Sequence, residues 1–376
     1  MSSPVRRVVV DELELPLVEP FETSFGVEKR RRFLVVQVES GDGEVGIGEC
    51  VASRDPLYSS ESVATARWMI QTYLVPVLWR GGGLSPESFR AHARVWRGHS
   101  MAKAAVEMAL WDLAARHQRR SLSGALGGHR YRVEVGVSVG IQSTVPRLVR
   151  RVGDYLEAGY RRIKIKVRPG WDELPVAALR KEFPDLRLWV DANQAYLPAA
   201  TAEVRRWASR YGVEQVEQPF AQHALAAHAR LSRRAPFRVC LDESVTDLAT
   251  FDAALELRAG TSLNVKAGRV GGLSAGRELG HRAADAGWPA WVGGMLESGI
   301  GRAHNVALAS LSQFTLPADL SASGRYYETD IAEPAFELGP GSTLAVPRGR
   351  GIGVEIVDSV YRRHLRRHRE FRPKTP

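Results

Sequence analysis

The pattern of apolar and polar positions predicts a small α+β unit in residues 1–128. Its elements are expected as strands at 5–15 and 33–50 and as helices near 60–77, 86–97 and 102–117. The second strand region contains Gly41-Asp42-Gly43, which is typical of a hairpin turn. A loop with two aromatic residues, Phe21–Gly26, precedes it and is either a lid or an ordinary packed loop. Gly127 and Gly128 mark the end of the helical part.

After Gly128 the pattern changes to strands that alternate with helices such as 146–158 and 198–210. The strands are predicted at 133–139, 162–167, 187–191, 213–217, 237–241, 262–266 and 289–292. Repeated units of about 25 residues predict a parallel sheet, and seven or eight of them favour a closed barrel over an open sheet. We therefore expect a capping domain at 1–128, a barrel domain at 129–325, and a segment at 326–376 that packs back on the capping domain.

Composition excludes several classes of protein. Hydrophobic residues at 44% and charged residues at 25% are ordinary for a globular chain of 376 residues. The sequence contains no apolar run of about 18 residues, so we expect no membrane partner. The N-terminus lacks the apolar core of a signal peptide. Two cysteines, Cys50 and Cys240, cannot form a disulfide framework and indicate free thiols in a reducing cytoplasm.

The net charge of +10 raises the question of a nucleic-acid partner. Much of the excess lies in the tail 361–376, in Arg362, Arg363, Arg366, Arg367, Arg369, Arg372 and Lys374. Because neither zinc-finger spacing nor aromatic residues between the basic ones accompany this cluster, we expect a solvated helix end or tail and no nucleic-acid partner.

The segment 162–167 alternates basic and apolar residues, which places Lys164 and Lys166 on one face of a strand. The chain has only seven lysines among its 52 basic residues. Lysine can lose its proton when it is buried, whereas arginine cannot. Lys164, Lys166 and Lys266 are therefore candidates for amines that transfer protons. The alternative is a pair of surface lysines on an edge strand.

Charged residues also end the strands that follow. Asp191, Glu217, Asp242 and Lys266 succeed one another at intervals of 26, 25 and 24 residues. One βα unit per interval brings all of them to the same rim of a barrel. A single acid at a strand end is more often a helix cap. Charged residues at the ends of several successive strands indicate a functional site. Three carboxylates without His or Cys are ligands for a hard divalent ion, Mg²⁺ or Mn²⁺.

These residues resemble the motifs of the enolase superfamily, in its muconate-lactonising subgroup. The resemblance is greatest to the family of o-succinylbenzoate synthases and N-acylamino acid (N-succinylamino acid) racemases. It runs from the Phe21 loop to about Gly353 and leaves out the basic tail. One departure is Ala267, where proline is also typical. The motifs are Lys164-Ile165-Lys166, Asp191-Ala192-Asn193, Glu217-Gln218-Pro219, Asp242-Glu243-Ser244, Asn264-Val265-Lys266, 293–299 and 314–319.

The resemblance implies an α/β fold, a modified TIM-type (β/α)7β barrel with an N-terminal α+β capping domain. It implies that Asp191, Glu217 and Asp242 bind Mg²⁺ or Mn²⁺, with Lys166 as the base on one face of the substrate and Lys266 on the other. Lys164 would stay charged beside the substrate carboxylate. Asn193 and Glu243 would orient the ligands and Lys266, or merely cap local backbone. Residues expected to select the substrate are Ser24, Ser138, Arg269, Gly293, Gly294 and Met295.

The activity that the resemblance implies is dehydration of 2-succinyl-6-hydroxy-cyclohexadiene carboxylate to o-succinylbenzoate, a step of menaquinone synthesis. The alternative is racemisation of N-succinylamino acids, and one protein can do both. Dipeptide epimerisation and muconate cycloisomerisation fit the stretch 293–319 less well. A non-enzymatic basic binding protein would leave the phased charges unexplained. We expect a small carboxylate as substrate and a homo-oligomer.

Overall fold

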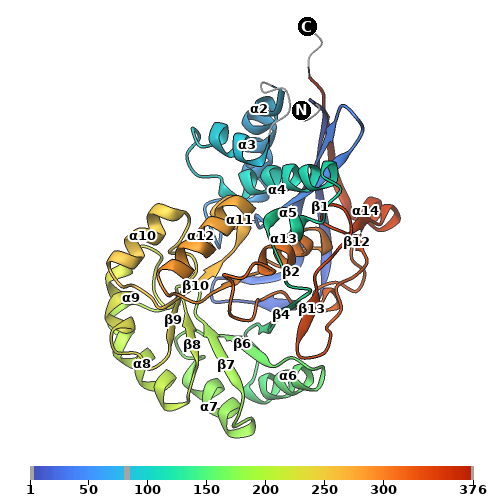
Figure 1. The fold of residues 1–376 in the computed structure, drawn as a ribbon. Helices are drawn as coiled ribbons and strands as arrows, with labels where there is room; N and C mark the ends of the chain where they lie inside the picture. The colour runs from blue at the N-terminus through green and yellow to red at the C-terminus, as the bar shows by residue number, and fades with distance from the viewer. Residues whose placement is uncertain (1–3, 80–84, 374–376) are drawn as a thin grey trace.

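The computed structural model describes residues 4–79 and 85–373. The first part of the chain forms an antiparallel sheet of β1 (Val5–Glu22), β2 (Val27–Ser40) and β3 (Val45–Cys50). The first two strands are longer than predicted, and only residues 23–26 separate them. The expected Phe21 loop is thus the tip of a long hairpin. Figure 1 shows this hairpin in blue, running from the top of the molecule toward the barrel.

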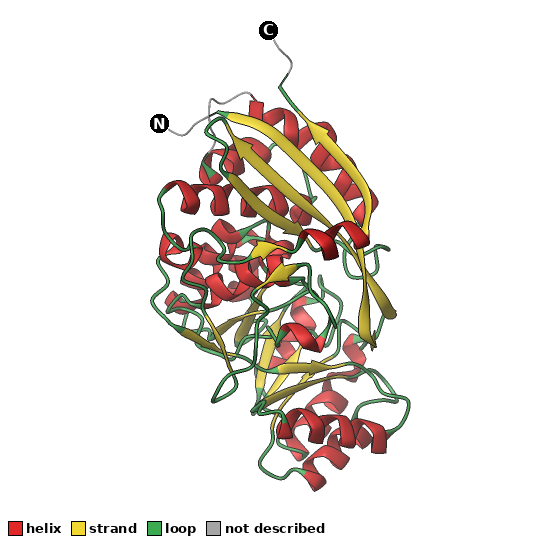
Figure 2. Cartoon of the chain, turned by 90° about the vertical axis from the view of Figure 1, so that its right-hand side faces the viewer, coloured by secondary structure: helices red, strands yellow, loops and turns green. Residues whose placement is uncertain are grey.

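Helices cover one face of this sheet (Figure 2). α1 (Val63–Met69), which continues through the π turn Ile70–Leu74 into α2 (Val75–Trp79), and α4 (Ser100–His117) lie against the sheet. α3 (Pro86–Ala93) packs on α2 and α4, and α5 (Leu122–Leu126) packs on α4. Helix α4 packs against β3 at Gly46 and Gly48, where an added Cβ would lie 2.1 Å from a backbone oxygen of the helix. Residues on every side of α4 are buried, because the helix is covered by the sheet on one side and by the barrel on the other.

The second part of the chain is a parallel sheet with the order β11-β10-β9-β8-β7-β6-β5. Its strands are β5 (Val137–Val139), β6 (Arg162–Lys166), β7 (Arg187–Asp191), β8 (Gln215–Glu217), β9 (Arg238–Leu241), β10 (Ser262–Val265) and β11 (Ala290–Val292). The helices between and after them are α6 (Val145–Glu157), α7 (Glu173–Glu182), α8 (Thr201–Arg210), α9 (Leu225–Ser232), α10 (Leu248–Glu256), α11 (Ala267–Val270), α12 (Leu273–Asp285) and α13 (Gly299–Ala309).

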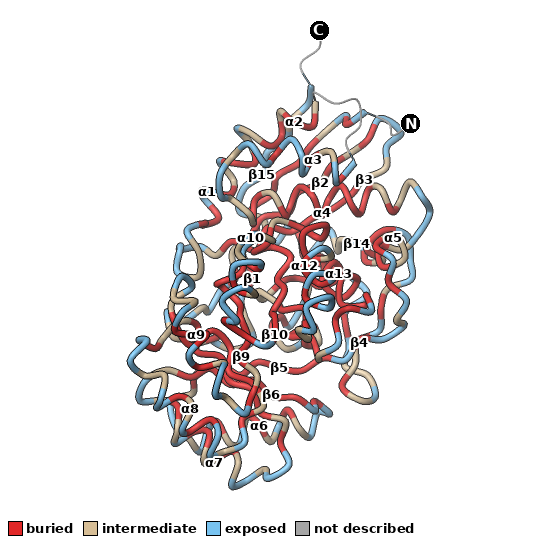
Figure 3. Tube along the Cα trace, turned by 60° about the vertical axis from the view of Figure 1, so that its left-hand side comes forward, coloured by how far each residue is buried: buried red, intermediate tan, exposed pale blue. Residues whose placement is uncertain are grey.

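The segment 314–319 joins the two edges of the curled sheet. On one side, the backbone N–H of Asp319 donates to the carbonyl oxygen of Val292 in β11. On the other side, the N–H of Ala318 donates to Glu134, and its carbonyl oxygen accepts from Gly136. This segment takes the place of an eighth strand, so the fold is the predicted α/β barrel of (β/α)7β type. Figure 3 shows the buried chain concentrated in these strands and in α4.

The structure also differs from the predicted elements at the start of the barrel and at the C-terminal segment. The strand expected at 133–139 is split, and its first half, β4 (Arg132–Glu134), pairs with β13 (Thr343–Ala345) outside the barrel. The basic segment expected as a solvated helix end or tail forms the exposed end of α14 (Asp358–His364) and then β15 (Leu365–Phe371), a strand that was not predicted and that pairs with β1 along the edge of the cap sheet. Lys374 lies outside the described residues. The short strands β12 (Ala332–Glu333) and β14 (Glu355–Ile356) pair with each other.

The core has one large apolar cluster in the barrel and a second in the cap. Cys50 and Cys240 are buried and free. In the part of the chain that the structure describes, no helix has both the length and the apolar character needed to cross a membrane.

Candidate active site

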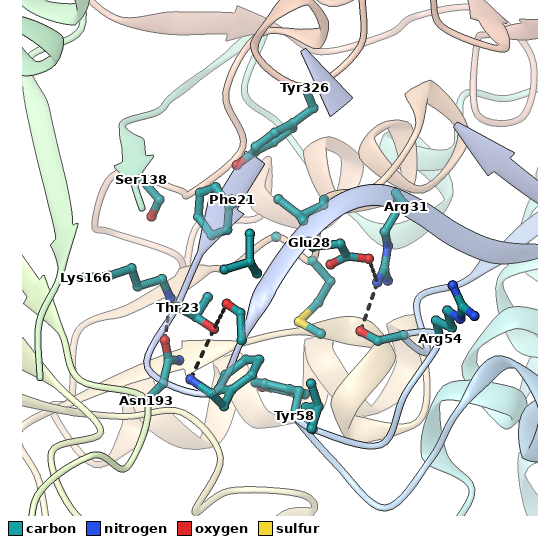
Figure 4. Close-up of a pocket in the computed structure, with 18 of the residues that line it drawn as sticks. Phe21, Thr23, Glu28, Arg31, Arg54, Tyr58, Ser138, Lys166, Asn193 and Tyr326 are labelled. Carbon is teal, nitrogen blue, oxygen red and sulfur yellow. Dashed lines mark hydrogen bonds and ion pairs between the residues drawn. The ribbon is translucent and has the colours of Figure 1, made fainter. Parts of the chain in front are cut away.

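A cavity of about 430 Å³ lies where the cap meets the carboxyl ends of the barrel strands (Figure 4). The cap contributes apolar side chains from the hairpin tip and from the loop after β3, and also charged side chains such as Glu28, Arg31 and Arg54. The barrel contributes charged and polar side chains. The residues from the cap include Phe21, Thr23, Phe25, Leu57 and Tyr58, and those from the barrel include Ser138, Lys164, Lys166, Asn193, Lys266, Met295 and Asp319.

Strand β6 carries the first two amines, and all five of its residues are buried. Lys166 Nζ donates to Asp191 Oδ2 at 2.6 Å and to Asn193 Oδ1 at 2.7 Å. Lys164 Nζ donates to Glu217 Oε2 at 2.7 Å and lies 3.0 Å from Asp319 Oδ2. The alternative of two surface lysines is therefore wrong, since Lys164 is only 2% exposed.

Lys266 lies four strands away around the sheet, directly after β10. Its Nζ donates to Asp242 Oδ2 at 2.7 Å and lies 3.3 Å from the hydroxyl of Tyr58. Arg269 donates to the other oxygen of Asp242 and to the backbone oxygens of Val245 and Asn264. Because β6 and β10 are on different sides of the curled sheet, the two amines approach the cavity from different directions.

The three predicted metal ligands end neighbouring strands, as their spacing requires. Asp191 and Glu217 are register partners at the ends of β7 and β8, and Asp242 follows β9. All three are at most 1% exposed. Side-chain and backbone groups fix their orientation, because Asn264 Nδ2 donates to Glu217 Oε1 at 2.7 Å and Asn193 N donates to Asp191 Oδ1 at 3.0 Å.

Charge pairing controls the protonation of this cluster. Burial alone would raise the pKa of Asp191, but the charges of Lys166, Lys164 and Lys266 lower it to about 2. Burial alone would lower the pKa of Lys164, but Asp319, Glu217 and Asp191 raise it above its ordinary value. The pKa of Lys266 is raised in the same way, against burial, by Tyr58, Glu217, Glu243 and Asp191.

Asp191, Glu217 and Asp242 offer only carboxylate oxygens, and oxygen is the ligand atom that a hard divalent cation prefers. One buried oxygen next to them, Glu243 Oε2, has no hydrogen-bond partner among the described residues. However, no three Asp, Glu, His or Cys side chains within 4–79 and 85–373 lie close enough to share one ion. The ammonium groups of Lys164, Lys166 and Lys266 instead pair with the carboxylates. Coordination by all three acids stays a prediction, and it requires side chains to move.

Asn193, which lines the cavity, is hydrogen-bonded to Glu243. Asn193 Nδ2 donates to Glu243 Oε1 at 3.2 Å, while its Oδ1 holds Lys166. Burial raises the pKa of Glu243 to about 7, and the charge of Asp191 adds to this effect. The structure thus connects both residues to the charged cluster, although their roles stay predictions.

The residues predicted to select the substrate fall into two groups. Ser138, Gly294 and Met295 line the cavity. Ser24, Gly293 and Arg269 do not line it, although Ser24 and Arg269 contact the lining residues Asn193 and Tyr58. Ser24 Oγ donates to the carbonyl oxygen of Asn193 at 3.1 Å. Gly293 packs against the side chain of Asn264. Arg269 pairs with Asp242 and is 4% exposed, so it has no surface role.

Sequence reasoning missed Tyr58, Asp319 and Arg162. Tyr58 lies in a loop without periodicity, and 208 residues separate it from Lys266. Asp319 belongs to the segment that closes the barrel and accepts hydrogen bonds from Ser138 Oγ at 2.6 Å and from Arg162 at 3.1 Å. The alternation in β6 could have predicted Asp319. It places Arg162 on the same face as Lys164 and Lys166, and a third buried cation on that face requires an acid opposite it.

Comparison with known proteins gives a consistent result along the chain. The model of the mandelate racemase / muconate lactonizing enzyme N-terminal domain matches residues 5–127, and the enolase C-terminal domain-like model matches 147–360. An N-succinylamino acid racemase of Thermus thermophilus is 45% identical over 92% of both chains. An o-succinylbenzoate synthase of Geobacillus stearothermophilus is 40% identical over 99% of this chain and 97% of its own. A solved structure of an enolase superfamily member from Listeria innocua has a TM-score of 0.94 at 36% identity, covering 98% of this chain and 99% of its own.

Proposed function

Since the chain belongs to the enolase superfamily, whose members use a divalent metal ion, we propose that it removes the proton next to a substrate carboxylate. The observation that carries this proposal is the pair of buried amines, Lys166 and Lys266, which line one cavity and form ion pairs with carboxylates at the ends of the barrel strands. Proton removal at carbon needs a base in contact with that carbon and a way to stabilise the negative charge that results.

We assign Asp191, Glu217 and Asp242 as the ligands of Mg²⁺ or Mn²⁺. When bound there, the ion would offset the negative charge that builds on the substrate carboxylate as the proton leaves. Lys164 would stay positively charged beside the same carboxylate. Asp319 supports this role, because it holds the ammonium group of Lys164 in place.

Lys166 takes the proton from one face of the substrate, and Lys266 faces the opposite side. In a dehydration, Lys166 would pass the proton to the hydroxyl group that leaves as water, while Lys266 stays charged. In a racemisation, one lysine takes the proton and the other donates a proton to the opposite face. The same two amines therefore serve both reactions.

The balance of charge favours a substrate with two carboxylates. Among the described residues, ten buried side chains in the cluster around the predicted metal ligands comprise five acids and five bases, so the charges of this set nearly cancel. A divalent ion adds two positive charges, and a dianionic substrate restores the balance that a buried cluster requires. The ten side chains are Asp191, Glu217, Asp242, Glu243, Asp319, Arg162, Lys164, Lys166, Lys266 and Arg269.

Two succinyl-bearing substrates meet this requirement. Dehydration of 2-succinyl-6-hydroxy-cyclohexadiene carboxylate to o-succinylbenzoate is our first candidate, supported by relatives of that name at 34–40% identity. Racemisation of N-succinylamino acids is the second, supported by relatives of that name at 44–45% identity. The active-site chemistry is the same for both.

The test is to measure kcat/KM on the dehydration substrate and on several N-succinylamino acids with one preparation of the metal-loaded protein. Exchange of the α-proton in D₂O, followed by proton NMR, detects proton removal even where no net racemisation is seen. Exchange without dehydration would assign the protein to racemisation alone. The absence of both reactions would refute the proposal.

A further inference from the structure

Tyr58 is the cap residue that contacts the amine of Lys266. Lys266 Nζ lies 4.6 Å from the centre of the tyrosine ring and 3.3 Å from its hydroxyl oxygen. The hydroxyl donates to Asp242 Oδ1 at 3.1 Å, next to the oxygen that pairs with Lys266. Figure 4 shows Tyr58 apart from Lys166, which lies beside Asn193 on another side of the cavity.

The loop that carries Tyr58 is fixed at both ends. Arg31 donates to Ser53 Oγ at 2.9 Å and to the carbonyl oxygen of Val51. At the other end, the carboxylate of Glu61 accepts from the backbone of α4, at 2.8 Å from Met101 N. Such contacts hold a side chain in one position against the barrel.

The same loop is seated closely on the short helix that follows Lys266. Val51 packs against Gly268, where an added Cβ would lie only 2.3 Å from Val51 Cγ2. Since Gly268 is two residues from Lys266, this packing fixes the backbone of the amine and the loop of Tyr58 relative to each other.

The two amines are thus held by different means. A lysine side chain has four rotatable bonds, and an aromatic face and a hydroxyl oxygen both favour one position of its ammonium group. Lys266 has these contacts from Tyr58 in addition to its ion pair with Asp242 of the barrel. Lys166 is held by Asp191 and Asn193, both from the barrel. The described contacts of Tyr58 at this cluster are with Lys266, Asp242 and Arg269 and not with Lys166, so a change at Tyr58 should act on Lys266 more than on Lys166.

We infer that Tyr58 is a positioning residue for Lys266, and that it controls proton transfer on one face of the substrate only. The inference rests on the proposed function, in which each lysine serves one face. The cap thereby sets the relative rates at which the two enantiomers of a substrate lose their α-proton. Proton transfer requires close and aligned groups, so a mobile Lys266 would be slower.

The experiment follows α-proton exchange in D₂O for each enantiomer of N-succinylphenylalanine, with the Mg²⁺-loaded protein. Lys166→Arg and Lys266→Arg first identify the enantiomer that depends on Lys266. Tyr58→Leu, which removes both contacts, should slow exchange of that enantiomer about 10-fold, and Tyr58→Phe, which keeps the ring, about 3-fold. Exchange of the other enantiomer should stay within about 2-fold of wild type. Equal losses for both enantiomers, or no loss, would overturn the inference.

Phe25→Leu is the matched control. Phe25 lines the same cavity and its ring lies 6.4 Å from that of Tyr58, so its loss should alter both enantiomers alike through KM. Thermal unfolding of each variant checks that the fold is intact.

A second measurement is independent of turnover. Trinitrobenzenesulfonate labelling followed by peptide mass spectrometry should rise several-fold at Lys266 in Tyr58→Leu and stay constant at Lys166. If the wild type exchanged neither enantiomer, the proposed racemisation would fail while this labelling still decided the role of Tyr58. Unchanged labelling of Lys266 would contradict that role.

Discussion

The ammonium nitrogen of Lys164 lies 3.0 Å from Oδ2 of Asp319, and this ion pair joins β6 to the segment that closes the barrel. Asp319 also accepts from Arg162 and Ser138. Burial alone would raise the pKa of Asp319, but Lys164 and Arg162 lower it far below its ordinary value, so the carboxylate stays charged. One acid therefore connects the closure of the barrel with the position of a cation in the active site.

Asp319→Asn should destabilise the protein by about 3–5 kcal/mol, because it leaves Lys164 and Arg162 buried with one negative charge fewer. Urea unfolding measures this loss. Asp252→Asn is the control, since Asp252 pairs with Arg282 where both side chains are about half exposed. That surface pair should contribute less than about 1 kcal/mol. Similar small losses in both variants would contradict the role given to Asp319.

Removal of divalent metal should abolish turnover, and Mg²⁺ or Mn²⁺ should restore it. In the proposed site, the ion supplies the positive charge that lets a substrate carboxylate bind beside three buried carboxylates. Metal at about 100 times its Kd should also stabilise the fold by about 2.7 kcal/mol, which appears as a higher melting temperature. Glu217→Gln should lose most of this shift. Full turnover in the presence of a chelator would refute the metal site.

Lys166→Arg and Lys266→Arg should each keep the positive charge but lose the ability to exchange a proton. We expect racemisation to fall about 100-fold or more in either variant. Lys181→Arg is the matched control, because Lys181 is exposed at the end of α7, and it should keep the wild-type rate. Steady-state kcat on an N-succinylamino acid makes the comparison. A wild-type rate in Lys166→Arg would remove that residue from the mechanism.

The barrel and its charged rim were predictable from the sequence because both follow from short-range periodicity. Each strand places alternate residues on one face, and each βα unit has nearly the same length, so Asp191 and Glu217 had to be neighbours. The family resemblance added roles to these positions. It did not add the contacts between them, since ion pairs such as Lys166 with Asp191 depend on side-chain packing.

The contacts of the cap were not predictable by the same means. Tyr58 contacts Lys266 from a loop, and neither the length nor the composition of a loop predicts which residues it will contact. The edge strand β15 was missed because its exposed residues are nearly all charged, so the alternation that identifies a half-buried strand is absent. Pairing with β1 stabilises it through backbone hydrogen bonds that leave no pattern in the sequence.

Gly48→Ala should destabilise the cap, because its Cβ would lie 2.1 Å from the carbonyl oxygen of Ala105 in α4. Neither atom can rotate away, so β3 and the helix must separate, at a cost of about 1–3 kcal/mol or more. Gly41→Ala is the control, since a Cβ there would make an ordinary contact at 3.5 Å from Pro4. Unfolding curves in urea compare the two variants. Equal stability would show that α4 adjusts without cost.

The stability of the contact between cap and barrel should fall as the pH rises, because of Glu49 in β3. Its carboxylate accepts from Ser298 Oγ and from Gly301 N, at the start of α13. Burial, together with the nearby charge of Glu297, raises the pKa of Glu49 from 4.5 to about 7. Arg31, Cys50 and Tyr327 are further titratable groups whose charges interact with it.

The sign follows from proton binding. Between pH 4.5 and about 7 the folded protein keeps a proton on Glu49 that the unfolded chain has released, so unfolding becomes easier with rising pH. Glu49→Gln cannot titrate and should lack this contribution. The difference in unfolding free energy between wild type and variant should shift in favour of the variant by about 1.4 kcal/mol per pH unit across this window. Urea unfolding at pH 5, 6 and 7 measures the slope, and parallel pH profiles of the two proteins would contradict a raised pKa at Glu49.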